Sequence, residues 1–256
     1  VVGDIADFDS HDVWRVVGTR DELLASVTDG FDVTTQWPLR VRLLSGGDRD
    51  FVLALTVHHI AADGESILPL VTDIVTAYTA RAQGDSPDWA PLEVQFADFA
   101  IWQHTVLGSA DDAESVIGRQ LSYWRSQLAG APDVLELPAD RPRPAVASYA
   151  GADVTFGIPA RVSDRVAAVA GEFGVTPFMV VHTALAALLA RLTATGDIMV
   201  GTPTAGRGQA ALDPLIGMFV NTLVLRTAVD TGKPFAELLD QVRVTNLDAL
   251  EYSDVP

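Results

Sequence analysis

The chain has 256 residues, and a length of this order can bury one large hydrophobic core or two smaller ones. It contains no cysteine, which excludes disulfides and zinc–thiolate sites, and its net charge of −17 argues against nucleic acid and anionic membrane surfaces as partners. No apolar run reaches the length of a transmembrane helix, so we expect a soluble, cytoplasmic globular protein.

The first half of the chain predicts a lobe that combines a small sheet with several helices. Alternating apolar and polar residues favour strands, and apolar residues at helical spacing favour helices. The strands are predicted over residues 13–17, 39–44 and 51–57, the last two forming a hairpin. The helices are predicted over residues 20–29, 66–81, 92–107 and 117–128. We assign residues 1–130 to this first lobe.

A proline-rich crossing over residues 131–152 separates this lobe from a second one, over residues 153–256. The second lobe is predicted to hold strands 154–158, 197–202 and 219–226 and helices 160–173, 177–192 and 234–250. His182 falls in the apolar stripe of one of these helices, where a core role is more probable than a catalytic one. Strands alternating with helices in two lobes predict an α/β sandwich.

A short motif ends the predicted strand 51–57, where His58 and His59 are followed by Asp63 and Gly64. Successive side chains on a strand point to opposite faces, so one imidazole faces the protein and the other a cleft. Asp63 can fix an imidazole tautomer or hold the loop through a buried ion pair, and Gly64 permits a positive φ or a close backbone approach. A metal site is disfavoured, since it needs three or four ligands and no further cluster is nearby. We therefore expect acid–base chemistry at this loop.

This motif resembles the HHxxxDGxS signature of condensation domains from nonribosomal peptide synthetases, which belong to the chloramphenicol acetyltransferase-like superfamily. Four more segments resemble motifs of the same family in the same order. They are Phe-Ala-Asp-Phe-Ala-Ile-Trp at 96–102, Gly-Thr-Pro-Thr-Ala-Gly-Arg at 201–207, Ile-Gly-Met-Phe-Val-Asn-Thr-Leu-Val-Leu-Arg at 216–226 and Asp-Val-Pro at 254–256. The chain lacks two earlier motifs of the family and stops within a later one. We therefore expect a two-lobed α/β fold that is incomplete at both ends.

The resemblance implies a reaction between two thioesters carried on phosphopantetheine. An upstream carrier protein would deliver a donor acyl or peptidyl group, and a downstream carrier would deliver an acceptor aminoacyl group. Amine attack on the donor carbonyl would form a peptide bond in a tunnel between the lobes. The domain itself would bind no cofactor, and its partners would be carrier proteins and adjacent synthetase domains, not nucleic acid or membrane.

The family motifs also assign roles to individual residues. His59 matches the catalytic histidine, which removes the amine proton or orients the amine. His58, Asp63, Gly64 and Arg207 match supporting positions, and we predict a partly buried ion pair between Asp63 and Arg207 that bridges the lobes. The expected residues of the substrate channel are Asn221, Ser66 and Glu65, although Asn221 can instead satisfy backbone groups and Glu65 can face solvent.

Two kinds of alternative function are considered, another enzyme of the same fold and a non-catalytic module. A coenzyme A-dependent acyltransferase shares part of the motif, but the doubled histidine and the segment around Asn221 argue against it. A heterocyclisation domain would carry aspartates in place of the histidines, and the Asp-Gly context favours condensation over epimerisation. A non-catalytic docking module of the same fold would be expected to lose His59, which is present.

Overall fold

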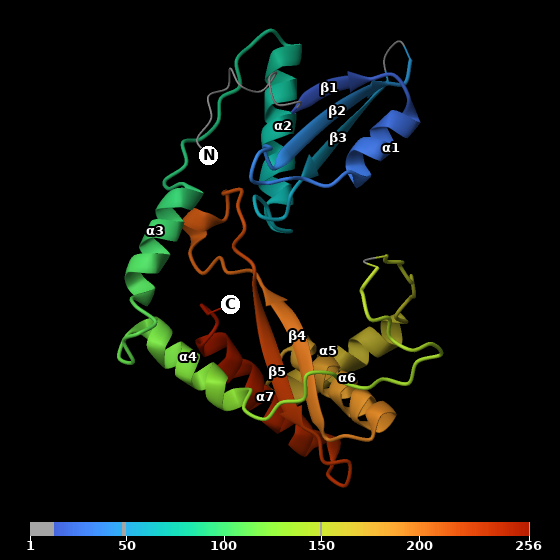
Figure 1. Ribbon diagram of the computed structural model, residues 1–256, viewed down its shortest axis with the longest axis vertical. Helices are drawn as coiled ribbons and strands as arrows, with labels where there is room; N and C mark the ends of the chain where they lie inside the picture. The colour runs from blue at the N-terminus through green and yellow to red at the C-terminus, as the bar shows by residue number, and fades with distance from the viewer. Residues whose placement is uncertain (1–12, 48–49, 149, 256) are drawn as a thin grey trace. The chain divides into compact units, whose positions relative to one another are not determined.

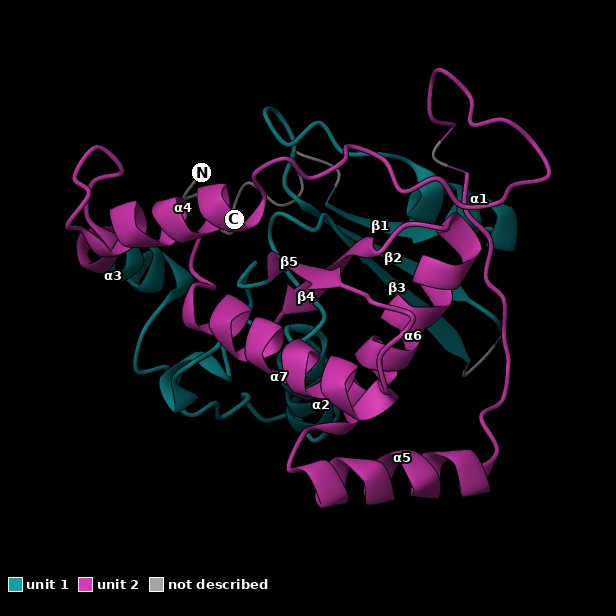
Figure 2. Cartoon of the chain, turned by 90° about the horizontal axis from the view of Figure 1, so that it is seen from below, with its two compact units in different colours: residues 1–103, 205–220 teal, residues 104–204, 221–256 magenta. Residues whose placement is uncertain are grey.

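The computed structural model describes residues 13–47, 50–148 and 150–255, which form two compact units (Figure 2). Unit 1 comprises the chain up to Gln103 and Ala205–Val220, and unit 2 comprises His104–Thr204 and the chain from Asn221 onward. The predicted lobes differ from these units in two segments. Residues 104–130 belong to unit 2, where Gln120 forms a hydrogen bond with Asp254 near the end of the chain. Residues 205–220 belong to unit 1, where Arg207 forms a hydrogen bond with Asp63 of the loop 58–66, called the histidine loop below.

Unit 1 contains a three-stranded sheet in the order β1–β2–β3 (Figure 1), which includes the three predicted strands and the predicted hairpin. Strand β1 (Trp14–Val17) runs parallel to β2 (Leu39–Ser45), and β2 forms an antiparallel hairpin with β3 (Phe51–Val57). Helix α1 (Arg20–Thr28) contacts all three strands. The Thr19 hydroxyl begins this helix by accepting a hydrogen bond from the Glu22 backbone N–H.

Two further helices of unit 1 follow the histidine loop, α2 (Ile67–Ala82) and α3 (Phe96–Leu107), whose last turn passes into unit 2. Helix α2 has no buried residue. The start of α3 packs on the returning segment that includes the short 3₁₀ helix η2 (Ala210–Leu212). Their shared apolar cluster contains Val94, Phe96, Phe99, Leu212, Leu215 and Phe219. This cluster ties residues about 120 positions apart into one core, and so fixes the segment that carries Arg207.

Unit 2 is built on the antiparallel pair β4 (Asp197–Thr204) and β5 (Asn221–Ala228). Helix α6 (Pro177–Thr193) packs on β4, and helix α7 (Phe235–Glu251) packs on β5 and on α6 (Figure 2). Helix α5 (Ala160–Phe173) packs on α6, and α4 (Val116–Gln127) contributes Trp124 beside β5. The core of these layers includes the fully buried side chains of Ala186, Ile198, Leu239 and Val242.

One predicted strand, over residues 154–158, is wrong. These residues have no regular secondary structure, and Val154, Phe156 and Ile158 are 84%, 77% and 64% exposed. The alternation of apolar residues was typical of a strand, but a strand needs a hydrogen-bonded neighbour, and no described strand pairs with this segment. The remaining predicted helices and strands are confirmed to within a few residues at each end.

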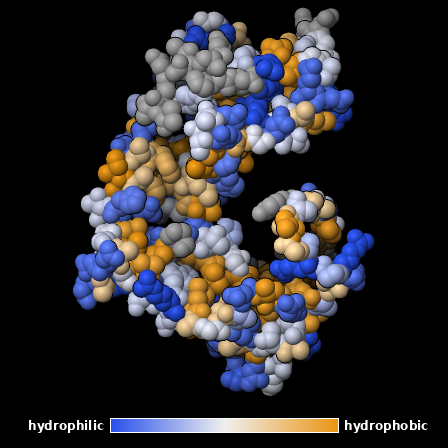
Figure 3. Space-filling model, viewed as in Figure 1, coloured by the Kyte–Doolittle hydropathy of each residue, from blue (hydrophilic) through white to orange (hydrophobic). Residues whose placement is uncertain are grey.

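Apolar side chains also remain on the surface of both units (Figure 3), among them Leu68 on α2 and Phe178 on α6. No single helix of the described chain is both long and apolar enough to cross a membrane. Helices α5 and α6 pass that test only when taken as a pair, and they meet at an angle of 105°.

His182 is a core residue, as predicted, with only 3% of its surface exposed. Its Nδ1 accepts a hydrogen bond from the Asn246 side-chain amide at 3.1 Å, so the proton of the neutral ring lies on Nε2. Burial lowers the pKa of this imidazole. The unfolded chain therefore binds a proton at a higher pH than the folded chain does.

This difference predicts that acid destabilises unit 2. The stability contributed by neutral His182 is complete above the ordinary pKa of 6.5 and declines as the pH falls below that value. Urea unfolding between about pH 8 and pH 5.5 should show a falling midpoint in the native chain. The variant His182→Gln keeps a hydrogen-bonding side chain that does not titrate, and it should show a weaker fall. An equal fall in both proteins would contradict the prediction.

Candidate active site

The histidine loop begins where β3 ends. The His58 backbone N–H donates to Pro38 O at 2.9 Å, which extends the hairpin by one residue, and the Ala61 N–H then donates back to His58 O at 2.9 Å. A second turn, closed by a hydrogen bond of 3.2 Å from the Ser66 N–H to Asp63 O, leads into α2. Two consecutive turns therefore separate the strand from the helix, and the two histidines lie at the start of the first turn.

The His58 side chain is engaged with the protein. Its Nδ1 accepts a hydrogen bond of 3.1 Å from the Ile60 backbone N–H, which leaves the proton of the neutral ring on Nε2. The ring also meets Phe31 edge-on, with 6.0 Å between ring centroids, and Phe31 lies under the Arg40 guanidinium. These contacts favour a structural role for His58 in holding the loop, as its family position implies.

The His59 side chain differs from that of its neighbour because it is exposed and forms no hydrogen bond to another described residue. The two imidazoles thus point into different surroundings, as expected for consecutive residues at a strand end. Neither nitrogen of the His59 ring is engaged by another described residue, so both are open to a substrate group. His59 is therefore the member of the pair that is available for chemistry.

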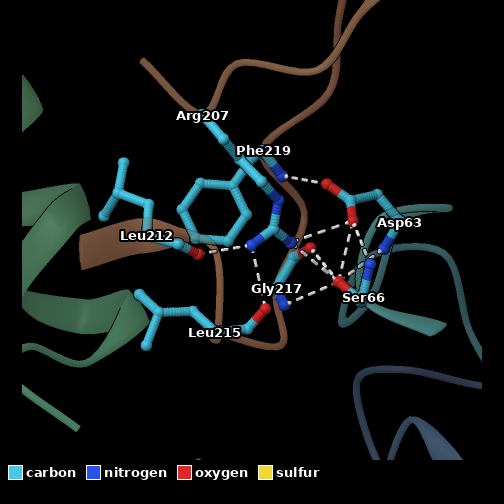
Figure 4. Close-up of polar contacts among 7 residues, drawn as sticks. All are labelled: Asp63, Ser66, Arg207, Leu212, Leu215, Gly217 and Phe219. Carbon is cyan, nitrogen blue, oxygen red and sulfur yellow. Dashed lines mark hydrogen bonds and ion pairs between the residues drawn. The ribbon is translucent and has the colours of Figure 1, made fainter. Parts of the chain in front are cut away.

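Asp63 and Arg207 form the predicted ion pair, with 3.1 Å between Asp63 Oδ1 and Arg207 Nη2 (Figure 4). The Asp63 and Arg207 side chains are 0% and 5% exposed. The prediction was wrong in one respect, because the pair lies within unit 1, to which residues 205–220 return, rather than joining two lobes. Arg207 Nη1 donates to the carbonyl oxygens of Leu212 and Leu215 at 2.6 and 2.9 Å. The guanidinium therefore connects the histidine loop, through Asp63, to the segment that contains Leu212 and Leu215.

The Asp63 carboxylate accepts hydrogen bonds on both oxygens. Oδ1 accepts from the Ser66 N–H and hydroxyl at 2.9 and 2.7 Å, and Oδ2 accepts from the Phe219 N–H at 3.0 Å. Burial alone would raise the pKa of Asp63, but the hydrogen bonds from Ser66, Phe219 and Arg207 outweigh it and hold the pKa below the ordinary value. The carboxylate is therefore ionised at neutral pH, and its stabilising contribution is lost only as the pH falls through that lowered pKa. Asp63 holds the loop and does not contact an imidazole.

Ser66 lies at the centre of this network, and its predicted place in a substrate channel is wrong because its side chain is fully buried. Its hydroxyl lies 2.7 Å from Asp63 Oδ1 and 2.9 Å from Gly217 O, the two acceptors within reach of its one proton. The same oxygen accepts from Arg207 Nη2 at 3.0 Å and from the Gly217 N–H at 3.1 Å. Ser66 thus joins the histidine loop to the segment that carries Arg207 (Figure 4).

The segment 205–220 needs glycine at two positions. Gly206 has a φ of +64°, and a Cβ there would collide with the Phe219 carbonyl oxygen. Gly217 lies against the Phe96 ring, so a Cβ would overlap that ring. Both glycines let the segment approach the aromatic cluster closely enough for the Arg207 guanidinium to stack on Phe219, at 4.0 Å from its ring centroid.

This close packing predicts that Gly217→Ala destabilises the chain by about 1–3 kcal/mol, because the Phe96 ring must shift to admit a methyl group. Chemical denaturation followed by circular dichroism measures the change. Gly30→Ala is the matched control in unit 1, since no atom lies within 4 Å of the added Cβ. Equal stability of the two variants would contradict the prediction, because it would show that the Phe96 ring moves without lowering the free energy of unfolding.

The other two predicted positions of the loop are exposed. Glu65 lines a groove of unit 1, which is consistent with either a channel or a solvent-facing role. Gly64 does not have a positive φ, and no atom of the described chain lies within 4 Å of a Cβ built there. Of the two alternatives open for Gly64, the positive φ is not found, and the open space in front of its backbone is compatible with the close approach of another group. Within the described residues, no group of His, Asp and Glu is arranged to hold a metal ion.

Asn221 belongs to unit 2, and its amide is committed to the backbone. Its Nδ2 donates to Ser253 O at 2.7 Å and to Val255 O at 2.8 Å, and its Oδ1 accepts from the Thr222 N–H at 2.7 Å. Gln120 exchanges two hydrogen bonds with Asp254 beside it. Of the two alternatives open from the sequence, the structure favours backbone satisfaction. Residues 253–255 are therefore held by hydrogen bonds from Asn221 of β5 and Gln120 of α4.

Sequence reasoning missed Arg226 as an organising residue of unit 2. Its guanidinium pairs with both oxygens of Asp197 at 2.8 Å, and Nη1 donates to the carbonyls of Gln127 and Ala129. The hydrogen bonds from Arg226 lower the pKa of Asp197. An arginine directly after the apolar residues 223–225 was the available signal, since a charge in a strand of the core needs a partner.

Comparison with known proteins agrees with this geometry. The family model for the condensation domain matches residues 18–256. A probable non-canonical nonribosomal peptide synthetase, CymA, of Salinispora arenicola is 46% identical over 99% of the chain, and an isonitrile lipopeptide synthase of Mycobacterium tuberculosis is 48% identical over 88%. The chain spans only 3% and 9% of those two proteins.

A solved structure also resembles the chain, a complex of the X-domain and OxyB from teicoplanin biosynthesis. The match has a TM-score of 0.86 and 34% identity, and it covers 95% of this chain and 55% of the solved one. The predicted α/β fold of the chloramphenicol acetyltransferase-like class is thereby confirmed. The chain belongs to the condensation-domain family.

Proposed function

We propose that this chain supplies the histidine loop of a condensation domain that forms peptide bonds in nonribosomal peptide synthesis. The donor would be an acyl or peptidyl thioester and the acceptor an aminoacyl thioester. Both would be attached to phosphopantetheine on carrier proteins, the proposed partners together with adjacent synthetase domains. The descriptions of the relatives as nonribosomal peptide synthetases support this proposal. The observation that carries it is the exposed His59 on a loop that the buried Asp63–Arg207 pair holds in place.

In the proposed reaction the acceptor amine attacks the thioester carbonyl of the donor. The new C–N bond replaces the C–S bond, and the proton lost by the amine is finally taken up by the departing thiolate. His59 would accept that proton or orient the amine toward the carbonyl. The reaction needs no acyl-enzyme, so no serine or cysteine nucleophile is required.

The negative charge of the chain limits how such carriers can dock. With a net charge of −17, the chain as a whole repels an acidic carrier protein at long range. Docking would therefore depend on local arginines and apolar contacts rather than on overall attraction. Increasing ionic strength should then weaken association with an acidic carrier less than it weakens an interaction driven by opposite net charges.

A second function is favoured by one comparison, because the X-domain structure was solved in complex with OxyB. The corresponding proposal for this chain is a docking module that recruits a partner enzyme and catalyses nothing. The two functions differ in what His59 does, since docking requires no imidazole at that position.

The deciding experiment uses a whole condensation domain that contains this chain. It is mixed with a donor carrier loaded with an acyl thioester and an acceptor carrier loaded with an aminoacyl thioester. Mass spectrometry of both carriers should show the acyl group on the acceptor and a free thiol on the donor. Equally fast transfer from acyl coenzyme A would instead support a coenzyme A-dependent acyltransferase. Absence of transfer, together with a stable complex with a partner protein, would support docking.

A further inference from the structure

A groove in unit 1 lies beside the loop that carries His59, because Glu65 and Arg207 are among its lining residues. Its volume is about 830 Å³, and it is lined by Glu65, by the first turns of α2, by residues 88–90 and 92, and by Arg207, Asp213 and Pro214. This volume falls within the range of sites that hold small molecules or short peptide segments. All of its lining residues belong to unit 1.

The groove offers apolar contact surface. Trp89 is 50% exposed, Leu68 74% and Leu92 45%, and all three line it. An indole ring that is half exposed in a groove can stack against aliphatic side chains and attract a cation to its face. Neighbouring apolar side chains left open to water in this way mark a surface that gains stability when it is covered.

The groove is also strongly negative. Four exposed carboxylates line it, on Glu65, Asp73, Asp88 and Asp213, and none of them forms an ion pair with another described residue. Among the described residues that line it, Arg207 is the one basic residue, and its charge is balanced by Asp63. A ligand that carries positive charge is therefore attracted, and an acidic carrier surface is repelled.

A separate observation concerns Arg207. Its side chain is 5% exposed, and its Nε–H has no hydrogen-bond partner within the described chain. A buried N–H group without an acceptor is unfavourable, and Arg207 also lines the groove, so a bound segment that reached this N–H with an acceptor oxygen would be stabilised. Backbone carbonyl groups of a peptide supply such oxygens, whereas a simple metal ion or an amine does not.

We propose that this groove binds an extended peptide segment in which a Lys or Arg side chain neighbours an apolar side chain. The cationic group would lie among the four carboxylates, and the apolar side chain would cover Trp89 and Leu68. A peptide carbonyl would face Arg207. Such a segment is a protein partner's tail or linker, distinct from the thioester substrates of the proposed reaction.

The test titrates the 256-residue chain with the peptide Ac-Lys-Leu-Arg-Leu-Lys-NH₂ at low ionic strength, by calorimetry and by tryptophan fluorescence. The paired substitution Asp73→Asn with Asp88→Asn should weaken binding about tenfold, corresponding to the loss of two charge contacts. Asp164→Asn with Asp240→Asn removes the same charge from exposed sites of unit 2 and should change the Kd less than about twofold. Circular dichroism verifies that both variants are folded.

Trp89 provides a second readout. The native chain should show a saturable fluorescence change on addition of the peptide, and Trp89→Phe should lose most of it. The acidic peptide Ac-Glu-Leu-Gln-Leu-Glu-NH₂ should not bind. Absence of saturable binding, equal weakening by the two aspartate pairs, or equal affinity for the acidic peptide would each overturn the proposal. Asp73, Asp88 and Trp89 have no role in the proposed reaction, so amide formation should be unchanged in these variants.

Discussion

Replacing His59 by alanine should lower the rate of amide formation by about 10²–10⁴, the range over which positioned acid–base groups contribute. The imidazole is exposed and bonded to no other described residue, so its removal leaves the fold unaltered. The measurement is acyl transfer between loaded carriers, carried out on a whole condensation domain that contains this chain. The expected loss is in kcat, because a group that accepts the amine proton or orients the amine acts in the transition state.

The matched control is His104→Ala, which removes another exposed imidazole from helix α3. It should retain full activity, and both variants should unfold at the same denaturant concentration as the native chain. If His59→Ala formed amide at the native rate, the docking function would be the better explanation. If His104→Ala lost as much activity, the effect would not be specific to the histidine loop.

Replacing Arg207 by alanine should lower the free energy of unfolding by about 3–5 kcal/mol, a large fraction of the stability of a typical domain. The side chain of Asp63 is fully buried, so the substitution leaves a carboxylate without its counter-ion. It also leaves the carbonyls of Leu212 and Leu215 without their shared donor, which loosens the segment 205–220. Equilibrium unfolding in urea measures the loss.

A double-mutant cycle separates the ion pair from the other contacts. Asp63→Ala combined with Arg207→Ala should cost less than the sum of the two single substitutions, because the second change removes a charge that the first left unpaired. Arg207→Lys keeps the charge but cannot reach Asp63 and the two carbonyls at once, so an intermediate loss is expected. Additive losses in the cycle would show that Asp63 and Arg207 act independently.

The contact between Asp63 and Arg207 was predictable from sequence although 144 positions separate the two residues. Both lie in recognisable motifs, and a buried carboxylate requires a partner. Helix bounds were also predictable, since they follow from local features such as the Thr176 cap and Pro177 at the start of α6. These features depend on residues that are close in sequence or on chemistry that leaves few choices.

Features that depend on contacts between residues far apart in the sequence were harder to predict. Ser66 was expected beside substrate, but its hydroxyl faces Gly217 and Arg207, and nothing local to Ser66 indicates that these groups return to it. The same holds for Asn221, whose acceptors lie more than 30 positions later in the chain. The strand wrongly predicted at 154–158 has the same origin. Its alternation of apolar and polar residues favours a strand, but a strand forms only where a second strand pairs with it, and no described strand does.

The path of the chain has a consequence for recombination between related synthetase genes. The polypeptide passes between the units at residues 103–104, 204–205 and 220–221, and Arg207 lies on the short excursion between the last two points. Any crossover placed between codons 67 and 206 would therefore join one parent's Asp63 and Ser66 to the other parent's Arg207 and Gly217. Chimaeras with breakpoints before codon 58 or after codon 220 would inherit the whole cluster from one parent, and they should yield folded protein more often.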